Sequence, residues 1–89
     1  MALRIINAGP APEVIAARIQ EAVEGALPGS QVAVRCTSPG HFEVSVAASE
    51  FQGKPRVRQH QLVYQAIAPL MSGNDAPVHA IDRLETRIP

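Results

Sequence analysis

Cysteine, aromatic residues and long apolar runs are all scarce in this sequence. The single cysteine, Cys36, excludes an internal disulfide and fits a reducing compartment. Two phenylalanines, one tyrosine and no tryptophan argue against base stacking as the main use of the surface, because single-strand binders present several rings. No stretch approaches the ~20 apolar residues that span a bilayer, and the first twelve residues lack the apolar core of a signal peptide. We therefore expect a cytoplasmic protein without a membrane partner.

Neither positive nor negative charge is in excess. Lysine and arginine number 8, and aspartate and glutamate number 8, so the formal net charge is zero. The summed charge of the chain would not hold it on DNA or on an anionic membrane. The distribution is uneven, however. No carboxylate side chain occurs from Phe51 to Asn74, and three cations, Lys54, Arg56 and Arg58, fall within five positions there.

The 89 residues are enough for one domain and one core. Residues 1–11 end in a Gly-Pro-Ala-Pro run and are expected to form a leader, with the domain over 12–89. Apolar spacing predicts a helix from Pro12 to about Ala26 and a second helix from Pro55 to about Met71, whose last turn Pro69 should kink or shorten. Period-two alternation predicts strands over 32–36 and 42–48, joined as a hairpin by Ser-Pro-Gly, and a last strand from about 78 to 87.

The order helix, strand, strand, helix, strand predicts an α+β domain with both helices on one face of a three-stranded sheet. One residue is out of register in the last strand, where Arg83 stands at a position that should be apolar and Leu84 follows it. A β-bulge near Asp82 and Arg83 explains the slip. The residues expected to share one core lie on the apolar faces of these elements: Ile19, Val23, Val34, Phe42, Val44, Tyr64, Ile67 and Ile81.

Catalytic motifs are missing from the chain. There is no G-x-S-x-G, no phosphate-binding loop and no C-x-x-C. The carboxylates of Asp75, Asp82 and Glu85 have no spacing typical of an acid–base pair. We therefore predict that the protein is not an enzyme.

The segment from His41 to Tyr64 reads HFEVSVAASEFQGKPRVRQHQLVY, and Val78-His79-Ala80-Ile81 follows it. This arrangement resembles the BolA family. It has an apolar strand, then Phe-x-Gly-Lys, then a basic helix start with His-x-x-Val, and finally a C-terminal His-Ala strand. The resemblance covers roughly residues 12–88 and rests on the order and spacing of these segments together.

The resemblance implies a fold similar to class II KH domains, without their Gly-x-x-Gly loop. It also implies a non-enzymatic adaptor that binds a monothiol glutaredoxin through a shared, glutathione-ligated 2Fe–2S cluster, in iron–sulfur trafficking or iron sensing. The cluster would be held only in that complex, with none bound tightly by the chain alone. The alternative is a DNA-binding transcriptional regulator of the BolA type. A homodimer is compatible with both.

By resemblance, the C-terminal histidine and a His or Cys near the hairpin loop ligate one iron. The matching positions are His79 and Cys36, with His41 as the competitor for the second place. Neutral imidazole and thiolate both suit iron–sulfur clusters. Each residue also has a structural interpretation. His79 would be a solvent-facing or capping histidine, and Cys36, in register with Val32 and Val34, would be a small core residue.

Lys54, Arg56 and Arg58 at a helix start oppose the helix dipole. We interpret them as a surface for an anionic partner or for nucleic acid, lying beside His79; the alternative is a merely solvated face. His60 lies on the apolar stripe with Val57 and is expected to be a packed, hydrogen-bonded core histidine rather than a ligand.

Overall fold

The computed structural model describes residues 10–89, and within them the predicted order of elements is confirmed. The predicted leader, residues 1–11, lies almost wholly outside this range. None of the helices in the described range is long and apolar enough to cross a membrane. The elements are α1 Pro12–Ala26, β1 Gln31–Ser38, β2 His41–Ala47, the single 3-10 turn η1 Ser49–Phe51, α2 Arg56–Met71 and β3 Ala80–Arg87.

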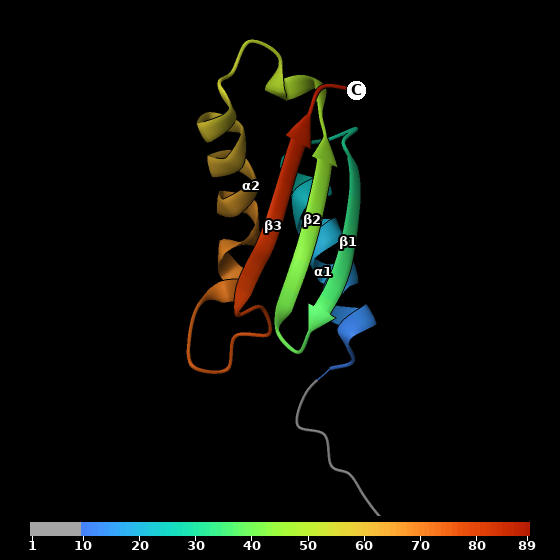
Figure 1. Cartoon of the computed structure of the whole chain (residues 1–89), viewed down its shortest axis with the longest axis vertical. Coiled ribbons are helices and arrows are strands. Elements are labelled where there is room, and N and C mark those ends of the chain that lie inside the picture. The colour runs from blue at the N-terminus through green and yellow to red at the C-terminus, as the bar shows by residue number, and fades with distance from the viewer. Residues whose placement is uncertain (1–9) are drawn as a thin grey trace, which may run out of the picture.

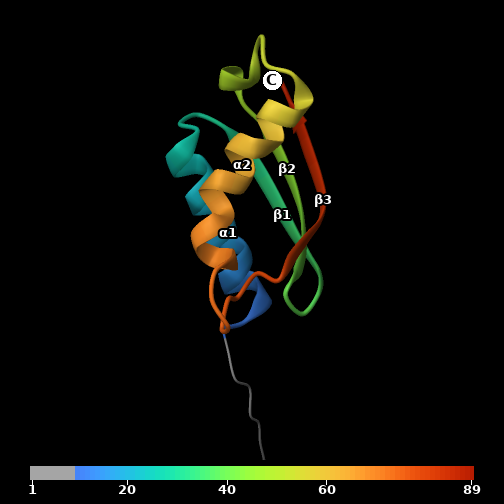
Figure 2. The same ribbon diagram turned by 90° about the vertical axis from the view of Figure 1, so that its left-hand side faces the viewer.

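The three strands form one sheet in the order β1-β2-β3. β1 and β2 are an antiparallel hairpin, whereas β2 and β3 are parallel, because the chain crosses over through η1 and α2 before it returns. Both helices cover the same face of the sheet (Figure 2). The other face is open and is the one seen in Figure 1. This arrangement confirms the expected α+β fold class.

α1 begins and ends where the sequence indicates. Pro12 lies at the first turn, where its missing N–H costs nothing, and Glu13 complements the positive end of the helix dipole. Ile15, Ile19 and Val23 recur at intervals of four and are buried against the sheet. Beyond Leu27, Gly29 adopts a positive φ of 81° that turns the chain toward β1.

The apolar stripe predicted for α2, which included Val57, His60, Tyr64 and Ile67, is only partly the buried face. Val63 and Ile67 are fully buried, whereas Val57 is 66% exposed and Tyr64 is 40% exposed. The helix carries apolar side chains on two adjacent faces, so spacing alone did not determine which of them meets the sheet. The predicted shortening at Pro69 is also absent, because α2 continues to Met71.

The core lies between the helices and the sheet. Of the eight predicted core residues, five are buried, and Val34 and Ile81 are half-buried and packed against them. Tyr64 was wrong. Buried residues that were not predicted include Phe51, which lies in η1, and Val78, which precedes β3. The aromatic ring of η1 therefore closes the core at one end of the sheet.

Two β-bulges flank the beginning of β2. On β3, Ile81 pairs with Phe42 and Arg83 with Glu43, so Asp82 is the extra residue. This confirms the predicted bulge. On β1, Cys36 pairs with Phe42 and Ser38 with His41, so the register also shifts at Thr37. Bulges re-aim side chains, and here both do so at the same level of the sheet.

Candidate functional site

His79 lies at the end of the sheet where β1 turns into β2. It directly precedes β3, is exposed, and donates its backbone N–H to the carbonyl of Gly40 over 2.8 Å. Its ring lies against that same glycine: a Cβ on Gly40 would come within 2.6 Å of His79 Nδ1. Gly40 also has a positive φ of 78°. The turn and the imidazole thus fit one another only because residue 40 has no side chain.

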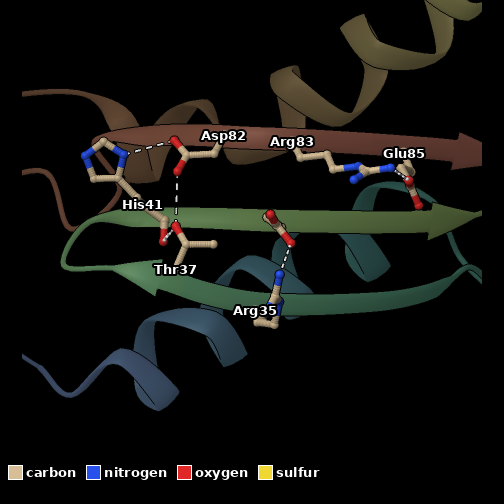
Figure 3. A network of polar contacts seen from close by, with 7 residues as sticks. Arg35, Thr37, His41, Asp82, Arg83 and Glu85 are labelled. Atoms are coloured by element: carbon tan, nitrogen blue, oxygen red, sulfur yellow. Dashed lines mark hydrogen bonds and ion pairs between the residues drawn. The ribbon is translucent and has the colours of Figure 1, made fainter.

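His41 follows Gly40 and opens β2, where its Cα is paired with that of Ala80. Its side chain is 42% exposed, and Nδ1 lies 2.9 Å from Oδ1 of Asp82 (Figure 3). In the neutral ring, Nδ1–H donates to the carboxylate and the lone pair is on Nε2. A carboxylate that fixes the tautomer in this way is a common support of metal-binding histidines. His79 packs on Gly40 and His41 follows Gly40 in the chain, so both histidines lie at the same end of the sheet.

Asp82 also reaches across β2 to the far edge strand. Its Oδ2 lies 3.1 Å from Thr37 Oγ1, whose distance to the carbonyl of His41 is 3.2 Å (Figure 3). The hydroxyl has one hydrogen and can donate to only one of these acceptors at a time. The hydrogen bond from His41, with a smaller contribution from Thr37, lowers the pKa of Asp82, while partial desolvation opposes the shift. Two bulged residues are thus tied together over the start of β2.

Cys36 lies on the opposite face of the sheet from His41. It pairs with Phe42, which is buried, and packs half-buried against the same core. The thiol donates to the carbonyl of Ser38 at 3.2 Å. The hairpin turn that follows is short, so its movement would not bring the thiol out of the core. These contacts match the interpretation of Cys36 as a small core residue.

The basic segment does not lie beside His79, and that prediction was wrong. Lys54, Arg56 and Arg58 are at the beginning of α2, whereas the backbone of Val78 is bonded to Leu70 near the end of the helix. The helix has 16 residues, so the two regions are separated by about 24 Å. Figure 1 shows them at opposite ends of the sheet.

Within the basic segment the three cations are not equivalent. Arg56 and Arg58 are exposed. Lys54 is half-buried, and its Nζ donates to the carbonyl of Glu50 at 2.7 Å, which fixes η1 to the start of α2. Lys54 therefore has a structural contact of its own, and Arg56 and Arg58 are the members available to a partner.

His60 differs from its sequence interpretation. It is half-buried rather than part of the core, and its Nε2 is buried with no hydrogen-bond partner in the described range. The sequence pattern gave no signal for this, because a helical stripe does not reveal what surrounds a ring nitrogen.

The open face of the sheet carries paired charges. Arg35 contacts Glu43 at 2.5 Å and Arg83 contacts Glu85 at 2.6 Å (Figure 3). The contact with Glu43 raises the pKa of Arg35. A shallow hollow of about 390 Å³ lies among these residues. Because its charges are matched within the sheet, the hollow offers little to a charged ligand.

No group of three or more His, Cys, Asp or Glu side chains placed to hold a metal occurs in residues 10–89. A 2Fe–2S cluster takes four ligands. Two donors from this chain, His79 and one other, fit a cluster only if further ligands come from elsewhere.

The family model described as "BolA-like protein" matches residues 17–88. The mouse BolA-like protein 1 is 32% identical over 79 residues, which cover 83% of this chain; the chain spans 56% of that relative's length. A bolA homologue from Coxiella burnetii is 30% identical, with a TM-score of 0.66 over 80% of this chain and 86% of that one. BolA1 from Arabidopsis thaliana shares the fold, with a TM-score of 0.71 at 22% identity, covering 83% and 90%. The matched residues include the bulged strand, His41, His79 and the basic helix start, and the chain belongs to the BolA-like family.

Proposed function

We propose that this protein is a non-enzymatic adaptor that binds a monothiol glutaredoxin through a shared, glutathione-ligated 2Fe–2S cluster. Its role is iron–sulfur trafficking or iron sensing. The observation that carries the proposal is that His79 packs on Gly40 at the end of the sheet where His41 follows Gly40 and Asp82 holds Nδ1 of His41. The partner and glutathione supply the ligands that this chain lacks.

Of the two candidates for the second ligand, His41 is the better supported. Its ring is partly exposed and its tautomer leaves Nε2 as a free lone pair. Cys36 would have to leave its core contacts and its bond to Ser38 before it could reach iron. Thiolate is a strong iron ligand, so the test includes both residues.

The experiment is reconstitution of the complex with a monothiol glutaredoxin and glutathione, followed by visible absorption and circular dichroism. His79→Ala and His41→Ala should each abolish or greatly alter the cluster spectrum. Both side chains are at least partly exposed, so their removal should shift the free energy of unfolding by no more than about 0.5 kcal/mol, apart from the His41 contact with Asp82.

Cys36→Ser is the matched variant. We expect its cluster spectrum to match the wild type, and its thermal stability to fall, since a hydroxyl replaces a thiol packed against the core. A spectrum lost in Cys36→Ser and kept in His41→Ala would move the second ligand to the thiol. An unchanged spectrum in His79→Ala would defeat the cluster proposal.

A second candidate function is DNA-binding transcriptional regulation. Its support is the exposure of Arg56 and Arg58 in a stretch free of carboxylates. Phosphate contacts release counterions, so the affinity should fall steeply with salt, and each removed contact should lower the log–log slope by about one unit. The measurement compares Arg56→Gln and Arg58→Gln with the wild type by fluorescence anisotropy. A DNA affinity that does not change with salt concentration would contradict this candidate function.

A further inference from the structure

A second hollow, of about 380 Å³, lies between α2 and β3. It is far from the histidines at Gly40, at the end of the sheet where α2 begins and β3 ends (Figure 1). We call it the α2–β3 groove. Its lining residues come from the first turns of α2 and the last residues of β3: Arg56, His60, Leu84, Glu85, Thr86 and Arg87.

The α2–β3 groove contains a buried polar atom that lacks a partner. His60 Nε2 is buried there and has no hydrogen-bond partner in the described range. Buried polar atoms are almost always paired, so such an atom requires an explanation. Both the imidazolium and the neutral tautomer protonated at Nε2 present an N–H at this position. An acceptor group in the groove would satisfy it.

The charges around that atom favour an anionic acceptor. Arg56 lies one turn before His60 on the same face of α2 and makes no side-chain hydrogen bond or ion pair within residues 10–89. Arg87 donates to the neutral hydroxyl of Ser45 at 3.0 Å, so its charge is not neutralised. The only lining carboxylate, Glu85, is bonded to Arg83 at 2.6 Å. Arg56 and the His60 imidazole thus stand at the opening without a free counter-charge, and Arg87 adds a second positive charge from the edge strand, where its guanidinium reaches Ser45 on the open face of the sheet.

We propose that the α2–β3 groove binds one oxyanion group, a phosphate or a carboxylate, through His60 Nε2–H with charge from Arg56 and Arg87. Arginine forks and imidazole N–H groups both form charge-assisted hydrogen bonds to such oxygens. The binding site is separate from the histidines at Gly40 and does not depend on the cluster proposal. It gives the carboxylate-free start of α2 a defined ligand chemistry.

The test is an NMR titration of the full chain with inorganic phosphate and, separately, with acetate, each at ionic strength held constant with chloride. The signals followed are the side-chain nitrogens of His60 and the backbone amides of the groove. We expect saturable shifts at these positions. Saturation with phosphate alone, acetate alone or both identifies which source of oxyanion the groove accepts.

Arg56→Gln should weaken that binding by about tenfold, as expected for the loss of one charge-assisted hydrogen bond. Arg58→Gln is the matched control: it removes the same charge two residues away, from a side chain that contacts Gln61 outside the groove, and it should change the affinity less than twofold. His60→Gln tests the orphan donor. Because Arg56 is exposed, its variant folds whether or not His60→Gln does.

Linear, non-saturating shifts with both anions would overturn the proposal, as would equal weakening by Arg56→Gln and Arg58→Gln. Shifts reproduced by chloride alone would do the same. The cluster spectrum of the glutaredoxin complex should be unchanged in Arg56→Gln, so failure of one proposal is distinguishable from failure of the other.

Discussion

Gly40 is the residue on which the position of His79 depends. Its positive φ and the ring packed against it both exclude a side chain. Gly40→Ala should destabilise the fold by about 1–3 kcal/mol from backbone strain, with a further cost from the clash. It should also displace the imidazole and so alter the cluster spectrum with every proposed ligand present. Urea unfolding and the visible spectrum measure the two effects.

Gly29→Ala is the control for Gly40→Ala. Gly29 has nearly the same φ, 81°, but nothing lies within 4 Å of its would-be Cβ. It should therefore show the backbone strain alone and leave the spectrum intact. Equal losses of stability in the two variants, with equal spectra, would mean that His79 is free to move away.

Asp82 links stability to pH at the same end of the sheet. Because the hydrogen bond from His41 lowers the pKa of Asp82 in the folded state, the ionised carboxylate stabilises the fold above its unfolded pKa of about 3.9. That stabilisation is lost as the pH falls through the folded pKa. Asp82→Asn should thus lower Tm at pH 7, and the difference from wild type should shrink at pH 3.

Asp75→Asn is the comparison for this pH series, since Asp75 lies in the exposed loop before β3. Its Tm should follow the wild type at both pH values. A difference between Asp82→Asn and wild type that stays constant from pH 7 to pH 3 would contradict the link through Asp82.

The residues of the site were only partly predictable. The resemblance pointed to His79, because a motif carries its spacing, and to Cys36 for the second position, with His41 as the competitor. The partnership of His41 with Asp82 was not predicted, although the bulge itself was. A bulge can be inferred from one apolar residue out of register, but the direction of its side chain depends on the second bulge at Thr37. That contact joins residues 45 positions apart, which no local pattern records.

At the scale of elements, Gln59 fastens α2 to its neighbours. Its Nε2 donates to the carbonyl of Lys54 at 2.9 Å, and its Oε1 accepts from Thr86 Oγ1 at 2.7 Å. Gln59→Ala should cost about 1–3 kcal/mol, the sum of two partly buried hydrogen bonds. Thr86→Val should cost about half as much, and the double variant little more than Gln59→Ala. Chemical denaturation of all three measures the coupling.

Gln65→Ala is the control for Gln59→Ala, since Gln65 is exposed on the same helix. Its change in unfolding free energy should be within about 0.5 kcal/mol. A similar loss in both glutamine variants would attribute the effect of Gln59 to helix propensity and not to its bonds.

The elements themselves were predictable because proline and glycine separate them. Pro12 and Pro55 precede or open the helices, and glycines follow α1 and divide the hairpin. The orientation of α2 was predicted only in part: Ile67 is buried as expected, but Val63 takes the buried place that was expected for Tyr64. The choice between them depends on the sheet below, and on Phe51, whose burial the short 3-10 turn decides.

At the scale of the whole molecule, the two proposed sites occupy opposite ends of one sheet. Substitutions more than about 10 Å apart with no shared partner usually add. The double variant Arg56→Gln with His79→Ala should therefore lose the oxyanion shifts and the cluster spectrum to the same extent as the two single variants. Measuring both signals on all three proteins checks this. A cluster signal altered by Arg56→Gln would show that the ends are coupled.

The parallel pairing of β3 with β2 has a consequence for how the molecule assembles. The hairpin joins neighbours in sequence, whereas β3 meets residues about 40 positions earlier. Closing so long a segment costs chain entropy before its contacts form, so β3 is expected to join the hairpin late. The histidines at Gly40 and the α2–β3 groove each draw residues from β3 or its first flanking position. A chain paused with a folded hairpin and an undocked last strand would have neither site, so its binding ability would appear in one step, at the end of folding.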